Sequence, residues 1–159
     1  MWDGTRVYRV PFDGEIDAIR YLALGHSTRQ ASQLLGLTVK DGARRRADEA
    51  QSKMHAVSHA DTLLRMCQLG LLDFRRDETL EPVLSGGQLH VFDLMVRLGM
   101  VYDDAYRVMG IGRNTLVRRM SEVCAALGSN GLRCHTMERA IAHGDVVVEP
   151  PAQLWRGKI

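Results

Sequence analysis

The strongest constraint on the fold of this chain is an internal repeat, because its two halves match at a shift of 74 positions without any gap. A fixed shift of this kind indicates that one supersecondary unit is used twice. We therefore expect two similar units in tandem. The matched pairs are Leu24-Gly25 with Leu98-Gly99, Gly36 with Gly110, Arg44-Arg45 with Arg118-Arg119, Thr62 with Thr136, and Gly70 with Gly144.

Each copy predicts four helices. Leu, Ala and Met carry the apolar content and aromatic residues make up only 6% of the chain, which favours helices over strands. Ser27, Thr28 and Thr38 are N-cap candidates, and glycines provide the stops. The expected helices are residues 13–24, 28–35, 39–55 and 59–69 in the first copy, and 87–98, 103–109, 113–127 and 133–143 in the second.

The predicted fold is all-α, with two tandem four-helix helix-turn-helix units joined by a short linker. The first unit, with an N-terminal arm, covers residues 1–72, and the second covers residues 84–145. Residues 73–83 are the linker, and residues 146–159 form an extended C-terminal tail.

The third helix of each copy carries a regular apolar stripe. In the second copy the stripe steps by 4, 3 and 4 residues, which places it on one helical face. The same steps occur in the first copy if one extra residue lies near Asp41-Gly42. A short helix, a turn with glycine and a longer helix are typical of DNA-binding helix-turn-helix pairs. The two stripes are Leu116, Met120, Val123 and Leu127, and Ala43, Ala47, Ala50 and Met54.

Several motifs resemble the LuxR-type (GerE-like) DNA-binding domain of bacterial transcription regulators. Leu84-Ser85-Gly86-Gly87-Gln88 resembles the opening of that domain, without its Pro and Arg. Met109-Gly110-Ile111 resembles its Leu-Gly-Ile turn, and residues 115–120 resemble its recognition helix. In the first copy, residues 33–38 and 64–72 match best. The resemblance covers residues 14–72 and 84–144.

The resemblance implies a sequence-specific regulator that binds double-stranded DNA with two recognition helices in the major groove. Arginine and asparagine suit this role because they pair bidentately with guanine and adenine edges. The expected DNA-binding residues are Ser27, Thr28, Arg29, Lys40, Arg44, Arg45, Arg113, Asn114, Thr115, Arg118 and Arg119.

Tyr102-Asp103-Asp104 departs from this pattern, because the family carries neutral or basic residues where these carboxylates would repel phosphate. The alternative is therefore a protein-interaction module with a helix-turn-helix fold, acting on RNA polymerase, a sigma factor or another regulator. For DNA binding, the two units would form an internal pseudo-dimer, or the chain would form a homodimer through its fourth helices. Half-sites would then lie about one turn, roughly 10 bp, apart.

Enzymatic function is not expected, since the sequence holds no nucleotide-binding loop, no nucleophile motif and no cofactor motif. His55 and His59 are four residues apart but lack a metal-binding motif, and three cysteines, Cys67, Cys124 and Cys134, have no metal spacing, so no metal is expected. These cysteines fit buried positions in a reducing cytosol. Without a signal peptide or an apolar run of membrane-spanning length, we expect a cytoplasmic, nucleoid-associated protein with no membrane partner.

Overall fold

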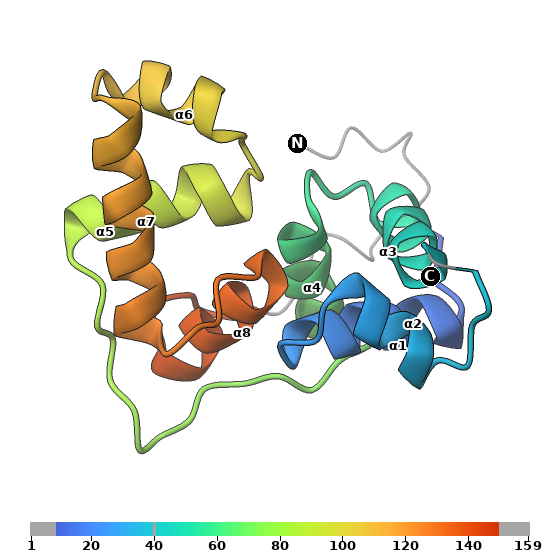
Figure 1. Ribbon diagram of the computed structural model, residues 1–159. Helices are drawn as coiled ribbons and strands as arrows, with labels where there is room; N and C mark the ends of the chain where they lie inside the picture. The colour runs from blue at the N-terminus through green and yellow to red at the C-terminus, as the bar shows by residue number, and fades with distance from the viewer. Residues whose placement is uncertain (1–8, 40, 150–159) are drawn as a thin grey trace.

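The computed structural model describes residues 9–39 and 41–149, which form eight α-helices and one short π-helix (Figure 1). The prediction of an all-α fold is confirmed. The grouping of the helices into two helix-turn-helix units with boundaries at 72 and 84 stays a prediction. The helices are α1 (Asp13–Ala23), α2 (Thr28–Leu34), α3 (Gly42–Lys53), α4 (His59–Gln68), α5 (Gly86–Phe92), the π-helix η1 (Asp93–Arg97), α6 (Tyr102–Met109), α7 (Arg113–Leu127) and α8 (Arg133–His143).

Local capping chemistry sets many of the helix ends. Ser27 opens α2 with a reciprocal capping box, in which its hydroxyl accepts the Gln30 backbone N–H at 3.2 Å and Gln30 Oε1 accepts the Ser27 N–H at 2.9 Å. At the other end of the chain, α7 and α8 stop at Gly128 and Gly144, whose φ angles are 72° and 83°. Because glycine has no Cβ, it adopts this left-handed conformation without steric cost.

Two predicted helices differ from the structure. The predicted helix 39–55 begins later, at Gly42, and its N-cap is Asp41 rather than Thr38. The Gly42 N–H donates to the Val39 carbonyl at 3.1 Å, three residues back, which is a turn contact. The Leu37 side chain also folds back onto Gly42, where an added Cβ would lie 2.7 Å from Leu37 Cδ1. The predicted helix 87–98 is split into α5 and η1, since the Leu98 N–H reaches back five residues to the Asp93 carbonyl at 2.9 Å.

The extra residue expected in the first copy is confirmed by burial. All eight residues of the two predicted apolar stripes are buried, and α3 matches α7 at a shift of 73 rather than 74 positions. This register corrects the predicted pairing of Arg44-Arg45 with Arg118-Arg119. Arg45 is instead the counterpart of Arg118, and Val117 stands at the position of Arg44. The reason is the longer connection before α3, which rotates this helix by one residue relative to the repeat.

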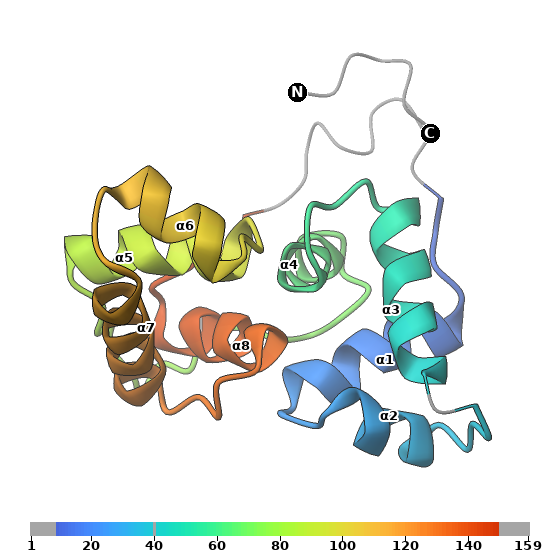
Figure 2. The same ribbon diagram turned by 45° about the horizontal axis from the view of Figure 1, so that its top comes forward.

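The two halves of the chain share one hydrophobic core. Helix α4 packs against α8, α1 packs against α8, and η1 packs against α4. In both views α4 and α8 lie at the centre, while α3 and α7 lie at opposite ends of the molecule (Figures 1 and 2). The contacts are reciprocal. At the 74-residue shift, α1 corresponds to α5 together with η1, and α4 corresponds to α8. The contact of α1 with α8 therefore corresponds to the contact of η1 with α4. Each half therefore uses the same elements to contact the other.

Polar contacts repeat this reciprocity. After α1, the Gly25 carbonyl accepts a hydrogen bond from Asn130 Nδ2 at 2.7 Å, just before α8. At the last residue of η1, the Arg97 carbonyl accepts one from the Ser58 hydroxyl at 2.9 Å, just before α4. In each case a turn that ends the first helix of one half lies against the start of the fourth helix of the other. The turns hold Gly25 and Gly99, which are paired by the repeat.

His135 contributes to one of these contacts. Its Nδ1 accepts the Asn130 backbone N–H at 3.1 Å, which requires an unprotonated nitrogen. Burial, with a smaller effect from the positive charge of Arg139, lowers the pKa of His135. The neutral imidazole therefore persists at pH 7 and holds the Asn130 loop in place against Gly25.

We expect Gly99→Ala to destabilise the protein more than Gly110→Ala. Both glycines have left-handed backbones, with φ of 66° and 67°, so either substitution costs about 1–2 kcal/mol for backbone strain. An added Cβ at Gly99 would lie 2.9 Å from Ser58 Cβ, whereas at Gly110 it meets nothing within 4 Å. Overpacking adds about 1–3 kcal/mol at Gly99. Urea unfolding of both variants measures the difference, and equal losses would contradict tight packing between the halves.

The connection between the halves is extended and attached to the second half. The Asp77 N–H donates to the Ala142 carbonyl at 2.9 Å. Further along, the Asp145 carboxylate accepts the N–H groups of Val83 and Leu84 at 3.1 and 3.0 Å. The predicted linker is therefore bound by hydrogen bonds to the end of α8 and to Asp145.

Candidate nucleic-acid interface

The exposed face of α7 carries four of the eleven residues predicted to bind DNA. Arg113, Asn114 and Arg118 are exposed, and Thr115 is half-buried beside them. The opposite face of the helix is fixed in the core by its apolar stripe. Only three residues, 110–112, separate α6 from α7, and Gly110 takes a left-handed conformation in this turn. The result is a rigid helix with its first two turns open to solvent.

Acidic neighbours surround this face. The guanidinium of Arg113 lies 3.5 Å from the Asp103 carboxylate and 5.9 Å from the Tyr102 ring centroid. Arg118 lies 4.0 Å from Glu122 on the next turn. Both ion pairs are largely exposed, so each contributes only about 0–1 kcal/mol and a phosphate can compete for the arginine. The electrostatic environment of α7 is therefore mixed rather than uniformly basic.

The contacts of Tyr102 with arginines of this region were not predicted from the sequence. Two cations approach its ring, with the Arg113 guanidinium 5.9 Å and the Arg133 guanidinium 5.8 Å from the ring centroid. Arg133 also donates to the Met95 carbonyl in η1. Tyr102 thus links the start of α7 to α8. Nothing in the sequence signals this contact, because the two arginines come from α7 and α8.

The exposed face of α3 holds a second group of predicted residues. Arg44 and Arg45 are exposed, while Lys40 lies outside the described residues. The next turn is acidic, with exposed Asp48 and Glu49. Asp48 is held by His59 of α4, whose Nε2 lies 2.6 Å from the Asp48 carboxylate. This link was not predicted from sequence, because Asp48 and His59 lie on different helices and only the packing of α4 on α3 brings them together.

Three predicted residues lie at the start of α2, beside α3. Ser27 uses its hydroxyl as the N-cap acceptor, and the Thr28 carbonyl accepts the Ser32 hydroxyl at 2.8 Å. That same Ser32 oxygen accepts the Ala43 N–H at 3.0 Å, which joins α2 to the start of α3. Arg29 is exposed. Arg29 is thus the member of this trio whose charged group is placed for an external partner.

The remaining predicted residue, Arg119, faces a different direction from Arg118. It is half-buried and lines a groove of about 270 Å³ between α7 and the start of α5, together with Gln88 and Glu122. Its counterpart in α3, Arg46, is also half-buried. Arg119 therefore lies where α7 packs on α5, and Arg46 lies where α3 packs on α1. Neither side chain belongs to the exposed face of its helix.

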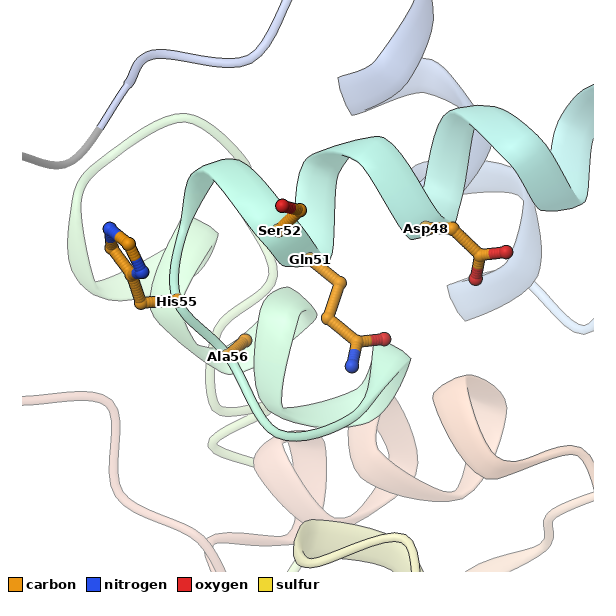
Figure 3. A pocket seen from close by; sticks show the side chains of 5 residues that line it. All are labelled: Asp48, Gln51, Ser52, His55 and Ala56. Carbon is orange, nitrogen blue, oxygen red and sulfur yellow. The ribbon is translucent and has the colours of Figure 1, made fainter.

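A shallow hollow of about 590 Å³ lies along α3 and the turn after it (Figure 3). Its lining includes Asp48, Gln51, Ser52 and His55, which are residue types found in catalytic sites. Asp48 and His55 lie at opposite ends of the row and do not converge (Figure 3). Catalysis by such residues needs hydrogen-bond reach between them. The hollow is therefore a polar surface along the helix.

The cysteines are free thiols; Cys67 and Cys134 are buried, as expected, whereas Cys124 is half-buried and differs from the prediction. Burial raises the pKa of the Cys67 thiol to about 11 and that of Cys134 to about 12, so both stay protonated at pH 7. Across residues 9–39 and 41–149, no group of three His, Cys, Asp or Glu side chains could hold a metal ion. Within the same residues, none of the helices has the length and apolarity needed to cross a bilayer.

Comparisons of this chain with protein-family models, with curated proteins and with solved structures find no match.

Proposed function

We propose that the chain is a sequence-specific transcription regulator that binds double-stranded DNA through the exposed faces of α3 and α7. The observation that carries this proposal is the match between these two helices. Each follows a short helix and a left-handed glycine turn, and each buries an apolar stripe. Each also exposes an arginine at the same register position, Arg45 in α3 and Arg118 in α7. The motifs that resemble LuxR-type domains lie in the same two segments.

The side chains on these faces fit base recognition. Arg113, Asn114 and Arg118 sit on the first turns of α7, where a recognition helix contacts base edges. No Asp or Glu occurs from Arg113 to Ser121. A net charge of +2 gives little attraction by itself, so local arginines must provide the contacts with phosphates and bases.

Selection of bound duplexes from a random DNA pool tests this function directly. We expect an enriched sequence whose affinity for the protein drops by about 100-fold between about 50 and about 200 mM salt, if about four phosphates are neutralised. The absence of any enriched sequence at both salt concentrations would refute the proposal.

Arg45→Ala and Arg118→Ala are expected to weaken binding to the selected duplex by about 5- to 150-fold each if each arginine reads a base. Each variant should relax specificity in a different part of the sequence, because α3 and α7 lie at opposite ends of the molecule (Figure 2). Arg75→Ala is the matched control, since Arg75 is an exposed arginine on the connection between the halves. Titration by fluorescence anisotropy measures all three affinities.

A second candidate function concerns the α6 side of the second half, which has a surface suited to a protein partner. Val101, the N-cap residue of α6, and Val108 within this helix are 60% and 64% exposed and lie seven residues apart, on the same side. Asp104 lies between them, and Asp103 stands where the first half has Arg29. In this case the second half would engage RNA polymerase, a sigma factor or another regulator. Unchanged DNA affinity in Arg118→Ala, with a loss in Arg45→Ala, would favour it.

A further inference from the structure

The fourth helix of each half uses the side chain at its third position to bind the backbone of the loop that precedes it. In α4, the Asp61 carboxylate accepts the Val57 N–H at 3.0 Å. In α8, His135 Nδ1 accepts the Asn130 N–H at 3.1 Å. Asp61 and His135 are paired by the 74-residue shift. The two halves therefore share one arrangement and differ in the chemistry of the acceptor.

The two acceptors respond differently to pH. An ionised carboxylate accepts hydrogen bonds through two oxygens, whereas an imidazole nitrogen accepts only while it carries no proton. An arginine follows four residues later in both helices. Arg65 Nε donates to Asp61 Oδ2 at 3.2 Å, so the acceptor of the first half belongs to an ion pair. In the second half, burial and then the charge of Arg139 lower the pKa of His135 from its ordinary value of 6.5.

The loop bound by His135 is also a contact with the first half. Asn130 Nδ2 donates to the Gly25 carbonyl at 2.7 Å. The imidazole lies against the same glycine, since a Cβ added at Gly25 would lie 3.0 Å from Asn130 Nδ2 and 3.5 Å from His135 Cγ. The base of the loop is held separately, because the Ser129 hydroxyl lies 2.7 Å from Thr136 Oγ1. Loss of the imidazole acceptor would therefore free the tip of the loop and leave its base attached.

We propose that His135 and Asn130 form an acid-sensitive latch, which opens in mildly acidic solution and releases the loop 128–132 from the first half. A proton on Nδ1 places a second donor against the Asn130 N–H, so the loop tip moves away and its bond to Gly25 is lost. The corresponding link on the other side, from the Ser58 hydroxyl to the Arg97 carbonyl, contains no titratable group. The latch therefore changes one of two equivalent contacts, while the shared core keeps the halves together.

The charged groups around the latch oppose a positive charge on the imidazole. Arg139 on α8 is itself a cation, and the neighbouring Glu138 carboxylate lies 3.7 Å from Arg139 Nε. The loop 128–132 contains no charged residue. In the facing turn after α1, the titratable residue is His26, whose ring lies 6.0 Å from the Tyr21 ring centroid in an edge-on contact. Protonation of the latch is therefore not compensated by a new ion pair from these groups.

The stability of the protein should change in the same direction. Because the pKa of His135 is lowered in the folded state, the unfolded chain binds this proton more readily. The contribution of His135 to stability is therefore complete above its ordinary pKa of 6.5 and is lost as the pH falls from there through the lowered value.

The test follows the full chain by NMR between about pH 7.5 and about pH 5, with the imidazole resonances reporting the titration of His135. Hydrogen-exchange protection of the Asn130 amide should fall by at least about tenfold along this titration, while that of the Val57 amide changes by less than about twofold. In His135→Asp, which copies the acceptor of the first half, protection of Asn130 should stay constant, since aspartate ordinarily titrates near about pH 3.9. His90→Asn is the control, because His90 is exposed on α5 and its loss should leave the response unchanged.

Asn130→Ala tests the latch from its other end. This variant lacks the bond to Gly25, and coupling between two sites is reciprocal, so the pKa of His135 should rise toward 6.5. Constant protection of the Asn130 amide down to about pH 5 in the unsubstituted protein would overturn the proposal. It would also be overturned if the loss of protection persisted in His135→Asp, or if Asn130→Ala left the pKa of His135 unchanged.

Discussion

Truncation of Phe92 is expected to lower the free energy of unfolding by about 3–5 kcal/mol. Phe92 is fully buried and is the largest of the side chains that have no solvent contact. It ends α5 where the backbone changes to the π-helix, so its ring packs at the junction that leads into the contact between η1 and α4. Since native domains have only about 5–15 kcal/mol of stability, this loss is a large fraction of the total.

Because the two halves share one core, Phe92→Ala should destabilise both of them. If both halves unfold as one unit, the slowest-exchanging amides of α1–α4 should lose as much protection as those of α5–α8. Hydrogen exchange measured by NMR tests this, with urea unfolding as the overall measure. Val108→Ala is the control, because Val108 is 64% exposed. Loss of protection confined to α5–α8 would show that the halves are independent domains.

Helices that end at local signals could be predicted from the sequence. The bounds of α7 and α8 match the expected residues, because glycines end both helices and a clear apolar stripe defines α7. The start of α3 could not be predicted in the same way. Leu37 packs onto Gly42 where this helix begins, and helix propensity alone does not report such a contact. The π-helix was missed because its apolar residues fit an ordinary α-helical pattern equally well.

How the two halves pack against each other could not be predicted from the sequence. Gly25 and Gly99 were interpreted as helix stops, which they are, but each also lies against the other half of the chain. A repeat in the sequence shows that two units are similar and leaves their relative placement open. For the candidate site, the exposure of Arg45 and Arg118 followed from the apolar stripes, whereas the partners of Arg113 and Asp48 arise from other helices. Such contacts depend on tertiary packing.

The contact that secures the end of α3 leads to the second large effect. Lys53, the last residue of α3, places its Nζ 2.7 Å from Glu15 Oε1, and these side chains are only 14% and 9% exposed. The same carboxylate oxygen accepts the Phe12 N–H at 2.8 Å, and the Lys53 ammonium lies 3.6 Å from the Phe12 ring centroid. Glu15→Gln is expected to destabilise the protein by about 3 kcal/mol, because it leaves a mostly buried ammonium without its counter-charge.

The double variant separates this pair from simple loss of packing. Lys53→Met alone should also destabilise, since it leaves the Glu15 carboxylate without a cation, but Glu15→Gln with Lys53→Met should cost less than the sum by about 2 kcal/mol. Urea unfolding of the three variants gives this coupling. The exposed pair of Asp73 and Arg75 provides the control, and Asp73→Asn there should change stability by less than about 1 kcal/mol. Additive losses in the double variant would mean that the ion pair does not hold α3 against α1, and the exposed arginines of α3 would then need another support for their orientation.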